Sequence, residues 1–524
     1  MASAPLSPGS LARLFVLAVL VVGLATCGAS ERPGTPPRHV VLVTVDTLRA
    51  DHLSAWLYDR PTSFLKATEQ ERERGADLSL DTLAGEGVIF RKAFAPRGMT
   101  SPSIASLMTG LTPLEHGLLN NGQVLDPEHG TLAESFRDAG FLTAGFTSNA
   151  LLVEASGLAQ GFDAFQCFTG PDKDLDVVRG ALAWLRQVGF LPEDGAGTPA
   201  AYDGQPVFLW LHFMGPHLPY DPQPINGPAG PIDFVGMFAD PDYEGDADGS
   251  REFLDAAYRD GAPLSGLDVN HVVAHYDGEV ARINYVVRTF LQLFTGAFEE
   301  TPRRALDDTL LVFASDHGEE LYERFGYWAH SKSVYSSVLH VPLFFRHPAS
   351  LTGRRVLDEV VTLEDVMPTL LDWFDLAPPR DLYGRSLLAL TDTYVERPFE
   401  SRPAYGMWRD QIFTLRVPKD QLDAGADGTR PEGDWRLIVN PGEVVPDDKP
   451  AGPYHIPKLA LHDLHADPKE RVDVGPDHPA VVEELQAELE AWLQGRQRFG
   501  RTAVSEDLIE ALDSLGYGTV GDGE

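Results

Sequence analysis

Short apolar segments that alternate with amphipathic ones constrain the fold of this 524-residue chain more than any other feature. Each apolar segment is only a few residues long, which is typical of strands buried in a parallel sheet. These predicted strands are Val40–Val45, Thr143–Thr147, Val207–Phe213, Leu310–Ala314 and Val341–Phe345. Helical patterns occur between and after them, at Leu132–Ala139, Val177–Val188, Ala274–Phe294 and Leu363–Phe374. The alternation predicts an α/β sandwich with a mostly parallel central sheet and helices on both faces.

The sequence changes character near residue 395. Two short strand-like segments, Ile412–Val417 and Trp435–Val439, precede one long helical pattern at Pro479–Gln497. We therefore expect one large domain at 38–395, which would carry the catalytic site, and a smaller α+β C-terminal subdomain with a terminal tail at 396–524. Segments rich in Gly, Pro and Asp are predicted to be surface loops, at Phe190–Gln205, Ile225–Asn270 and Asp420–Asp434.

The composition excludes several functions. Acidic residues number 78 and basic residues 42, which gives a net charge of −36. A chain this acidic is not expected to bind nucleic acid, or an anionic membrane, through its overall charge. Only two cysteines are present, Cys27 and Cys167, so a disulfide framework is excluded and Cys167 is predicted to be a buried free thiol. The sequence does not indicate an oligomeric state.

The N-terminus resembles a bacterial lipoprotein signal. Arg13 precedes the apolar segment Leu14–Ala25, which is too short to cross a bilayer comfortably. The segment ends in Leu24-Ala25-Thr26-Cys27, similar to the motif after which a cysteine is lipidated. We expect a signal peptide at 1–26, a Pro-rich tether at 27–37 and an extracytoplasmic protein held on the membrane by its lipid. A plain signal peptide and an uncleaved anchor are the alternatives.

Polar residues follow three of the predicted strands. Asp46 follows the first, His217 lies shortly after Val207–Phe213, and Asp316 and His317 follow Leu310–Ala314. In open α/β sheets, ligands bind beyond the carboxyl ends of the strands, so these side chains are expected to converge. A single Asp after a strand is more often a turn or capping residue, but three such ends together favour a binding site.

A helical segment at Thr100–Gly110 adds a hydroxyl to this set. Thr100 or Ser101 can cap the helix, Pro102 suits its first turn, and Gly110 suits its end. A hydroxyl at that position lies at the positive end of the helix dipole, where free backbone N–H groups bind anions. A metal ion in contact with it would lower the hydroxyl pKa and create a nucleophile. The same pattern also describes an ordinary capped helix.

Many short motifs in order resemble the sulfatase family of the alkaline-phosphatase superfamily, from about residue 38 to about residue 515. They are 45–52, 83–90, 100–110, 161–163, 216–220, 276–279, 315–319, 341–343, 368–371, 383–387, 463–464 and 467–468. The resemblance implies an alkaline-phosphatase-like sandwich, a divalent metal ion and hydrolysis of sulfate or phosphate esters.

The chain departs from the sulfatase pattern at its nucleophile. Thr100 stands where sulfatases carry the Cys or Ser that becomes formylglycine, Ile104 replaces the motif Arg, and Thr47 replaces the second Asp of a pair. No equivalent of the sulfate-binding Lys-x-His is evident. With Thr at this position, the chain resembles other members of the superfamily that use a metal-bound Thr. These are nucleotide pyrophosphatases, phosphonate hydrolases, lipoteichoic-acid synthases and lipid phosphoethanolamine transferases. Two further features, Met214-Gly215-Pro216-His217 and His330, thirteen positions after His317, are similar to the last group.

The resemblance implies that Asp46, Asp316, His317 and the Thr100 oxygen bind one cation. A mixed oxygen and nitrogen ligand set favours Zn²⁺ or Mn²⁺, and Ca²⁺ is possible by analogy with sulfatases. Thr100 is expected to form a covalent ester intermediate, with His217 and His330 stabilising charge or protonating the leaving group.

The leading hypothesis is therefore a hydrolase of a small-molecule, glycan or lipid ester. The alternatives are a transferase of phosphorylated head groups and a non-catalytic lipoprotein. Arg49 and Lys332 lie near the motifs as weaker site residues. Arg97 is expected to face solvent, with an approach to the substrate anion as the alternative.

The lipoprotein prediction can be tested in bacterial cells that express the full chain. We expect the protein in the membrane fraction, labelled by an alkyne fatty acid, and we expect Cys27→Ser to remove the label and release the protein, because Cys27 would carry the lipid. Cys167→Ser is the matched control and should keep the label. Labelling that persists in Cys27→Ser would contradict the prediction.

Overall fold

The computed structural model describes residues 36–64, 77–192, 204–227, 230–260, 263–296, 304–324, 326–351, 355–391, 399, 401–422, 432–443 and 455–496. The predicted signal peptide, Cys27, most of the tether, the 395/396 boundary and the tail after residue 496 lie outside the described residues. None of the described helices is both long enough and apolar enough to cross a membrane.

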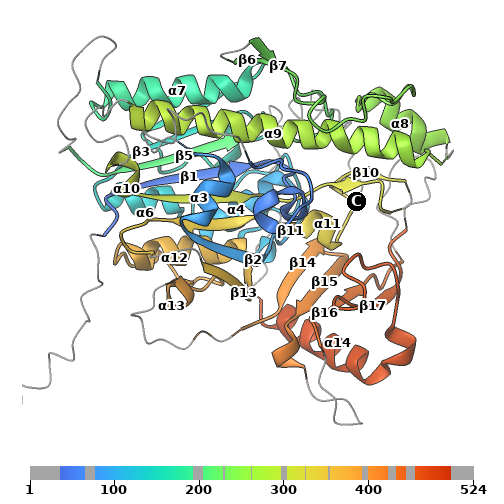
Figure 1. The fold of residues 1–524 in the computed structure, drawn as a ribbon. Helices are drawn as coiled ribbons and strands as arrows, with labels where there is room; N and C mark the ends of the chain where they lie inside the picture. Colours follow the sequence, from blue (N-terminus) through green and yellow to red (C-terminus); the bar gives the residue numbers. More distant parts are fainter. Residues whose placement is uncertain are drawn as a thin grey trace, which may run out of the picture.

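A nine-stranded sheet forms the centre of the larger part of the molecule (Figure 1). Its strand order is β11-β2-β12-β8-β1-β5-β3-β4, and β13 pairs with β2. The strands are β1 (His39–Val45), β2 (Val88–Phe94), β3 (Leu142–Thr147), β4 (Ala164–Cys167), β5 (Val207–Phe213), β8 (Thr309–Ser315), β11 (His340–Val341), β12 (Leu343–Arg346) and β13 (Arg355–Thr362). Neighbours from β8 to β4 are all parallel. The predicted mostly parallel α/β sandwich is confirmed.

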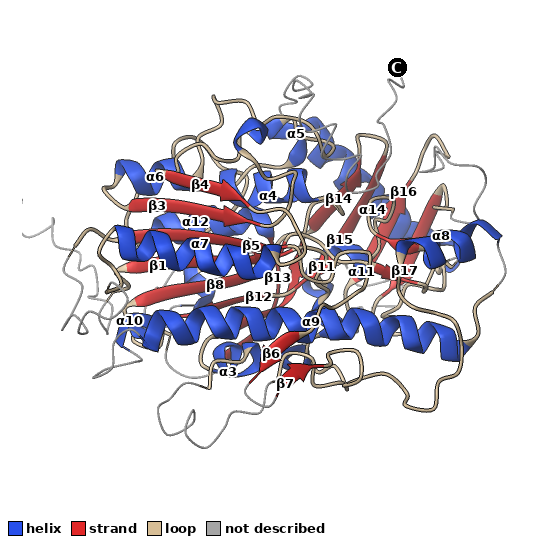
Figure 2. Cartoon of the chain, turned by 90° about the horizontal axis from the view of Figure 1, so that it is seen from above, coloured by secondary structure: helices blue, strands red, loops and turns tan. Residues whose placement is uncertain are grey.

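Both faces of β1 are buried, which explains its uninterrupted apolar sequence. Val41, Val43 and Val45 belong to a core that includes α7 (Lys173–Gln187) and α9 (Gly266–Gly296). Val40 and Leu42 belong to a second core on the opposite face. That second core includes α4 (Thr100–Thr109), α6 (Leu132–Asp138) and α12 (Val366–Trp373). Figures 1 and 2 show α7 and α9 running together across one face of the sheet.

One predicted strand is wrong in its direction. The segment Val341–Phe345 is divided at Pro342 into β11 and β12, and both run antiparallel to β2. β12 is also antiparallel to β8. Proline supplies no N–H to a ladder, so it interrupts the strand, and an apolar run does not reveal whether a strand is parallel.

The region Ile225–Asn270 is more regular than the predicted loop. It contains the hairpin β6 (Ile225–Gly227) and β7 (Gly230–Ile232), the helix α8 (Arg251–Asp260) and the first residues of α9. Among the described side chains of α8 only Leu254 is fully buried, so this charged, mostly half-exposed sequence resembles a loop. Of the other two predicted loops, 193–203 and 423–431 lie outside the described residues.

The smaller subdomain is an antiparallel sheet covered by one helix, as predicted. Its strands are β14 (Ala404–Trp408), β15 (Ile412–Val417), β16 (Trp435–Val439) and β17 (Leu459–Asp463). The helix α14 (Pro479–Gln494) packs Leu485 and Leu489 against this sheet and ends before Gly495, a few residues earlier than expected. Cys167 at the end of β4 is a free thiol, but it is only half-buried.

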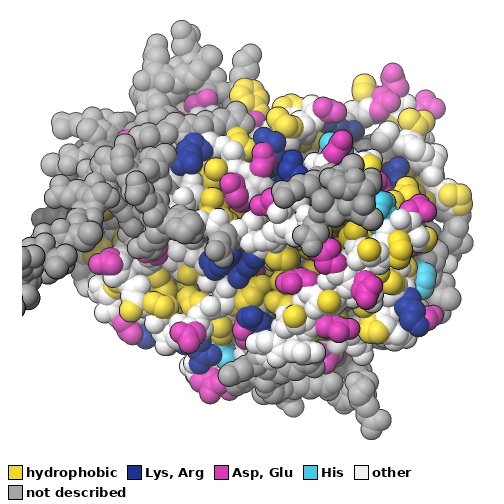
Figure 3. Space-filling view, turned by 90° about the horizontal axis from the view of Figure 1, so that it is seen from below, with side chains coloured by type: hydrophobic (Ala, Val, Ile, Leu, Met, Phe, Trp, Pro, Cys, Tyr) yellow, Lys and Arg dark blue, Asp and Glu magenta, His cyan; other side chains and the backbone are white. Residues whose placement is uncertain are grey.

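The acidic surplus does not form one continuous patch on the face that Figure 3 shows. Acidic side chains there are scattered among basic and apolar ones. This distribution is consistent with a solvated surface rather than with a docking surface for one polycation.

Two glycines with positive φ allow a matched stability test. A Cβ at Gly161 (φ +92°) would contact the backbone of Ala133 and Glu134, whereas a Cβ at Gly140 (φ +88°) would meet no atom within 4 Å. We expect Gly140→Ala to lower the free energy of unfolding by about 1 kcal/mol, because the only cost is that of holding alanine at a positive φ. Gly161→Ala should cost at least about 3 kcal/mol, because α6 must also move. Urea denaturation measures both, and equal losses would contradict the assigned contact.

Candidate active site

The carboxyl ends of two neighbouring strands bring three predicted residues together. Asp46 follows β1, and Asp316 and His317 follow β8, with Val45 opposite Ser315 in the parallel ladder. All three side chains are fully buried. His317 Nε2 lies 3.6 Å from Asp46 Oδ1 and 3.6 Å from Asp316 Oδ2.

The chemistry of these three side chains fits a metal ion. Asp46 Oδ1, Asp316 Oδ2 and His317 Nε2 have no hydrogen-bond partner within the described part of the chain. The three residues can each offer one ligand atom, all within 4.8 Å of one another. Buried ionised groups without partners are costly unless a cation compensates them. Two carboxylates and one imidazole suit Zn²⁺ or Mn²⁺.

The two carboxylates cannot both be ionised easily without a cation. Burial and the charge of Asp46 raise the pKa of Asp316 well above its usual range. Burial also opposes ionisation of Asp46, but the neighbouring His212, His217 and His317 hold the pKa of Asp46 below its usual range. Ionisation of Asp316 beside Asp46 is therefore opposed without a cation, and a bound divalent cation would stabilise both ionised carboxylates.

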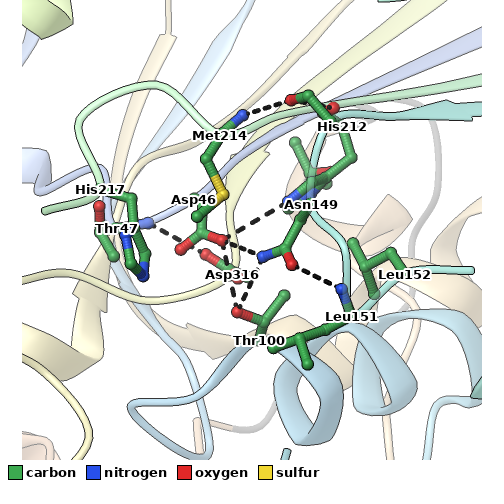
Figure 4. A network of polar contacts seen from close by, with 12 residues as sticks. Asp46, Thr47, Thr100, Asn149, Leu151, Leu152, His212, Met214, His217 and Asp316 are labelled. Atoms are coloured by element: carbon green, nitrogen blue, oxygen red, sulfur yellow. Dashed lines mark hydrogen bonds and ion pairs between the residues drawn. The ribbon is translucent and has the colours of Figure 1, made fainter. Parts of the chain in front are cut away.

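Thr100 lies beside this cluster, at the first position of α4. Its hydroxyl donates to Asp46 Oδ2 at 3.3 Å (Figure 4). The expectation that Thr100 or Ser101 caps the helix is wrong, because the N-cap residue is Met99 and no side chain caps it. The Thr100 hydroxyl is therefore available to Asp46.

Fewer backbone N–H groups are free to bind an anion at this helix end than the sequence analysis predicts. The Ser101 N–H donates to Asn121 Oδ1 at 2.9 Å, and Pro102 has no N–H. Side chains rather than backbone amides must therefore contribute most of the contacts to an anion here.

Asn149 and His212 contact the same carboxylate and were missed by the sequence analysis. Asn149 Nδ2 donates to Asp46 Oδ2 at 2.6 Å and lies 3.5 Å from Thr100 Oγ1. Asn149 follows β3 closely, so the rule that identified Asp46 would also have found it. His212 Nε2 lies 3.8 Å from Asp46 Oδ2, but His212 is inside β5 and no sequence signal distinguishes it.

His217 and His330 lie at the other side of the cluster. The ring centroid of His330 is 4.4 Å from that of His317 and 5.1 Å from that of His217. His217 Nδ1 donates to the Leu218 carbonyl at 2.7 Å, which places a ring proton on Nδ1. His330 Nδ1 is 3.0 Å from Glu319 Oε1. Glu319 belongs to the motif at 315–319 but was given no role from the sequence.

Burial sets the protonation of these groups. It lowers the pKa of His217 to about 4. It also lowers the pKa of His330 well below the usual range, with a further contribution from His317. Both rings are therefore neutral at pH 7, and a cation would hold them neutral more strongly. Burial raises the pKa of Glu319 to about 8, so this carboxyl keeps its proton at neutral pH.

The positions that depart from the family pattern have local explanations. Ile104 is fully buried in the core under the sheet, so its side chain is part of the packing. Thr47 has a φ of +53°, its N–H donates to Asp316 Oδ1 at 3.3 Å, and its buried hydroxyl has no partner among the described residues. A β-branched residue rarely adopts this backbone conformation, which marks the turn after β1 as strained.

The basic residues near the motifs have other roles. Arg49 pairs with Asp51 at 2.8 Å and with Glu323 at 2.7 Å, so it holds the loop after β1. Lys332 Nζ lies over the ring of Tyr327, 5.7 Å from its centroid. Arg97 does not face solvent as expected, because its side chain is buried against the N-terminal end of α4.

Comparisons with known proteins find similar sequences and structures. The sulfatase family model matches residues 38–376. The multifunctional alkaline phosphatase superfamily protein PehA of Trinickia caryophylli is 26% identical over 443 residues, covering 72% of this chain and 79% of PehA.

Two solved structures share the fold. The phosphonate monoester hydrolase of Agrobacterium radiobacter aligns with a TM-score of 0.57 and 22% identity, covering 88% of this chain and 95% of that one. A protein solved with its substrate D-glucosamine-2-N,6-O-disulfate aligns with a TM-score of 0.60 and 16% identity, covering 94% and 100%.

The repulsion between the two carboxylates predicts an unusual stability change. In metal-stripped protein at neutral pH, Asp316→Asn should raise the unfolding temperature, because folding raises the pKa of the Asp316 carboxyl and asparagine removes that cost. Without metal, the wild-type protein should lose stability relative to Asp316→Asn as pH rises above about 4, since folded Asp316 binds its proton more tightly than the unfolded chain does. The difference between the two proteins, rather than the pH profile of either alone, reports on Asp316. Calorimetry with chelator, over a pH series, measures both effects.

Added Mn²⁺ or Zn²⁺ should stabilise the wild-type protein and not Asp316→Asn. Asp365→Asn is the matched control, because Asp365 is buried but pairs with Arg402 at 2.6 Å. It should lower the unfolding temperature in all conditions and keep the response to metal. A metal response that survives in Asp316→Asn would refute the ligand assignment.

Proposed function

Because the chain belongs to the sulfatase family, and is therefore a hydrolase of sulfate or phosphate esters, we propose that Thr100 is its nucleophile beside one divalent cation held by Asp46, Asp316 and His317. The observation that carries this proposal is the Thr100 hydroxyl, directed at Asp46 from the first turn of α4. A divalent cation bound there would lower the pKa of the hydroxyl and offset the negative charge of the ester.

The side chain at position 100 favours phosphorus esters over sulfate esters. Thr carries a methyl group on its β-carbon, so its oxidation cannot give the aldehyde that sulfatases use. Ile104 in the core cannot support an aldehyde hydrate either. A threonine ester intermediate must instead be resolved by attack on phosphorus or sulfur. The similarity to PehA and to a phosphonate monoester hydrolase supports phosphate esters and phosphonate monoesters as the substrate class.

The reaction proceeds in two displacements. The Thr100 oxygen attacks phosphorus, its proton leaves along the hydrogen bond to Asp46, and the bond between phosphorus and the alcohol oxygen breaks. The alcohol takes a proton from solvent. Water then attacks phosphorus, which breaks the bond to Thr100 and restores the hydroxyl.

Four other side chains either exchange protons or hold the reacting groups in position. Neutral His217 carries its proton on Nδ1, so Nε2 accepts the proton of the attacking water. This role differs from the two expected for His217, which were to stabilise charge or to protonate the leaving group. Protonated Glu319 donates to His330 Nδ1, so His330 Nε2 carries the ring proton and donates to a nonbridging oxygen. Asn149 orients Asp46 and steadies the Thr100 oxygen.

The alcohol part of the substrate is proposed to be a small molecule or a glycan. This rests on the fold shared with a protein that was solved with a sulfated glucosamine. We further propose that the protein acts outside the cytoplasm, tethered through Cys27, as the N-terminal sequence suggests.

The proposal predicts a large loss of activity in Thr100→Ala. With aryl phosphate, aryl phosphate diester and aryl phosphonate substrates, kcat/KM should fall by on the order of 10³-fold or more, which is about 4 kcal/mol in the barrier. Metal content should stay unchanged, because three ligands remain. Metal analysis and initial rates check both expectations.

Thr109→Val is the matched control on the same helix, because the Thr109 hydroxyl bonds only to the backbone around Ala105 and Leu111. It should keep nearly full activity. Activity that survives Thr100→Ala would disprove the nucleophile. Turnover of sulfate esters alone would disprove the preference for phosphorus.

A further inference from the structure

Arg97 is a buried cation without a carboxylate partner. Its side chain is 1% exposed, and no Asp or Glu oxygen of the described residues lies within 4.0 Å of it. Four other buried arginines of this acidic chain are paired with carboxylates. Arg49, Arg282, Arg346 and Arg436 each contact at least one carboxylate, at 2.7 to 2.9 Å. An unpaired buried guanidinium lowers the stability of the folded protein, so a binding role is the explanation to consider for it.

Neutral atoms alone hold the Arg97 guanidinium in place. Nε and Nη2 each lie 3.2 Å from Met99 Sδ, and Nη2 donates to Asn120 Oδ1 at 2.8 Å. Nη1 has no partner among the described residues. Thioether sulfur is a weak acceptor, so most of the hydrogen-bonding capacity and all of the charge of this side chain are uncompensated.

Two more polar groups without partners lie along the same chain of contacts. Asn121, next to Asn120, accepts the N–H of Ser101 at 2.9 Å, and its own Nδ2 has no partner within the described residues. The Ser101 hydroxyl, 1% exposed, also has none there. Arg97 Nη1, Ser101 Oγ and Asn121 Nδ2 can all donate hydrogen bonds. Contacts of Arg97 with Met99 and of Asn121 with Ser101 connect these residues to the N-terminal end of α4, where Thr100 begins the helix.

The smaller subdomain adds positive charge to this region. The Pro96 carbonyl accepts the N–H of Met407 in β14 at 2.9 Å, which brings the turn after β14 close to Arg97. Arg409 in that turn has a φ of +53° and lies over the ring of Trp408. Burial, and then the charge of Arg409, lower the pKa of Arg97 to about 9, although Asp410 opposes the shift. The region is thus electropositive in a strongly acidic protein.

We propose that Arg97, Ser101 and Asn121 form a subsite for a second oxyanion of the substrate, a carboxylate, sulfate or phosphate on its alcohol part. The subsite rests on the proposed function, because Thr100 places the scissile ester beside it. An oxyanion would accept the three donors and neutralise Arg97. A substrate without that group would leave the cation unpaired, so the subsite selects doubly anionic substrates.

Thermal unfolding of the metal-stripped full chain tests whether Arg97 is held for a ligand. Arg97→Met should keep or raise the unfolding temperature, because it removes an unpaired charge. The matched control is Arg346→Met, which should lower it, because Arg346 is fully buried and pairs with Glu86 and Asp307. Inorganic phosphate should raise the unfolding temperature of the wild-type protein more than that of Arg97→Met. A loss in Arg97→Met like that in Arg346→Met, or an equal response to phosphate, would overturn the subsite.

Paired substrates test selectivity. A neutral aryl phosphate diester is compared with analogues that carry a ring carboxylate or a second phosphate, which distinguishes the two kinds of oxyanion. Wild-type enzyme should prefer at least one anionic analogue, and Arg97→Met should reduce that preference about 10- to 100-fold. Arg179→Gln, an exposed change on α7, should keep the preference.

The two proposals fail in different ways. If no substrate requires Thr100, the proposed function fails. If Thr100 is required but Arg97→Met leaves the preference unchanged, or wild-type enzyme has none, only the subsite fails.

Discussion

Two buried carboxylates beside one imidazole are the constraint on which the rest of this site depends. Asp46 and Asp316 are brought together because β1 and β8 are adjacent and parallel, so their carboxyl ends coincide. No basic side chain pairs with Asp316 among the described residues other than His317, at 3.6 Å. The fold therefore places a local deficit of positive charge where a cation is worth most. Thr100, Asn149 and His212 all gather around the same Asp46 carboxylate.

A network behind the carboxylates holds the strained turn in place. Ser315 Oγ donates to the Val45 carbonyl at 2.7 Å and accepts the Leu48 N–H at 3.0 Å. Tyr276 from α9 donates to the Thr47 carbonyl at 2.8 Å and accepts the Arg49 N–H at 3.0 Å. These four bonds fix the backbone on both sides of Thr47. They explain how a threonine is kept at positive φ, and why the long helix α9 contributes to a site that its own residues do not enter.

Much of the fold was accessible from the sequence because buried parallel strands are apolar on both sides. Val40–Val45 and Val207–Phe213 are recognisable for that reason, and the polar residues after them indicate where ligands bind. The direction of β12 was not accessible, since it depends on pairing rather than on composition. His212 and the burial of Arg97 were missed for a related reason. His212 approaches Asp46 only because β5 pairs with β1, and Arg97 is buried only once Asn120 and the subdomain strand β14 lie beside its loop.

The contact between Pro96 and Met407 has a consequence for which positions near α4 can be substituted. The loop that leads into α4 contacts β14 at the edge of a separate antiparallel sheet. Hairpin tips tolerate insertions and replacements far better than the strands that anchor them. Substitutions at Arg409 and Asp410 can thus change the charge around Arg97 and leave the residues around Asp46 as they are.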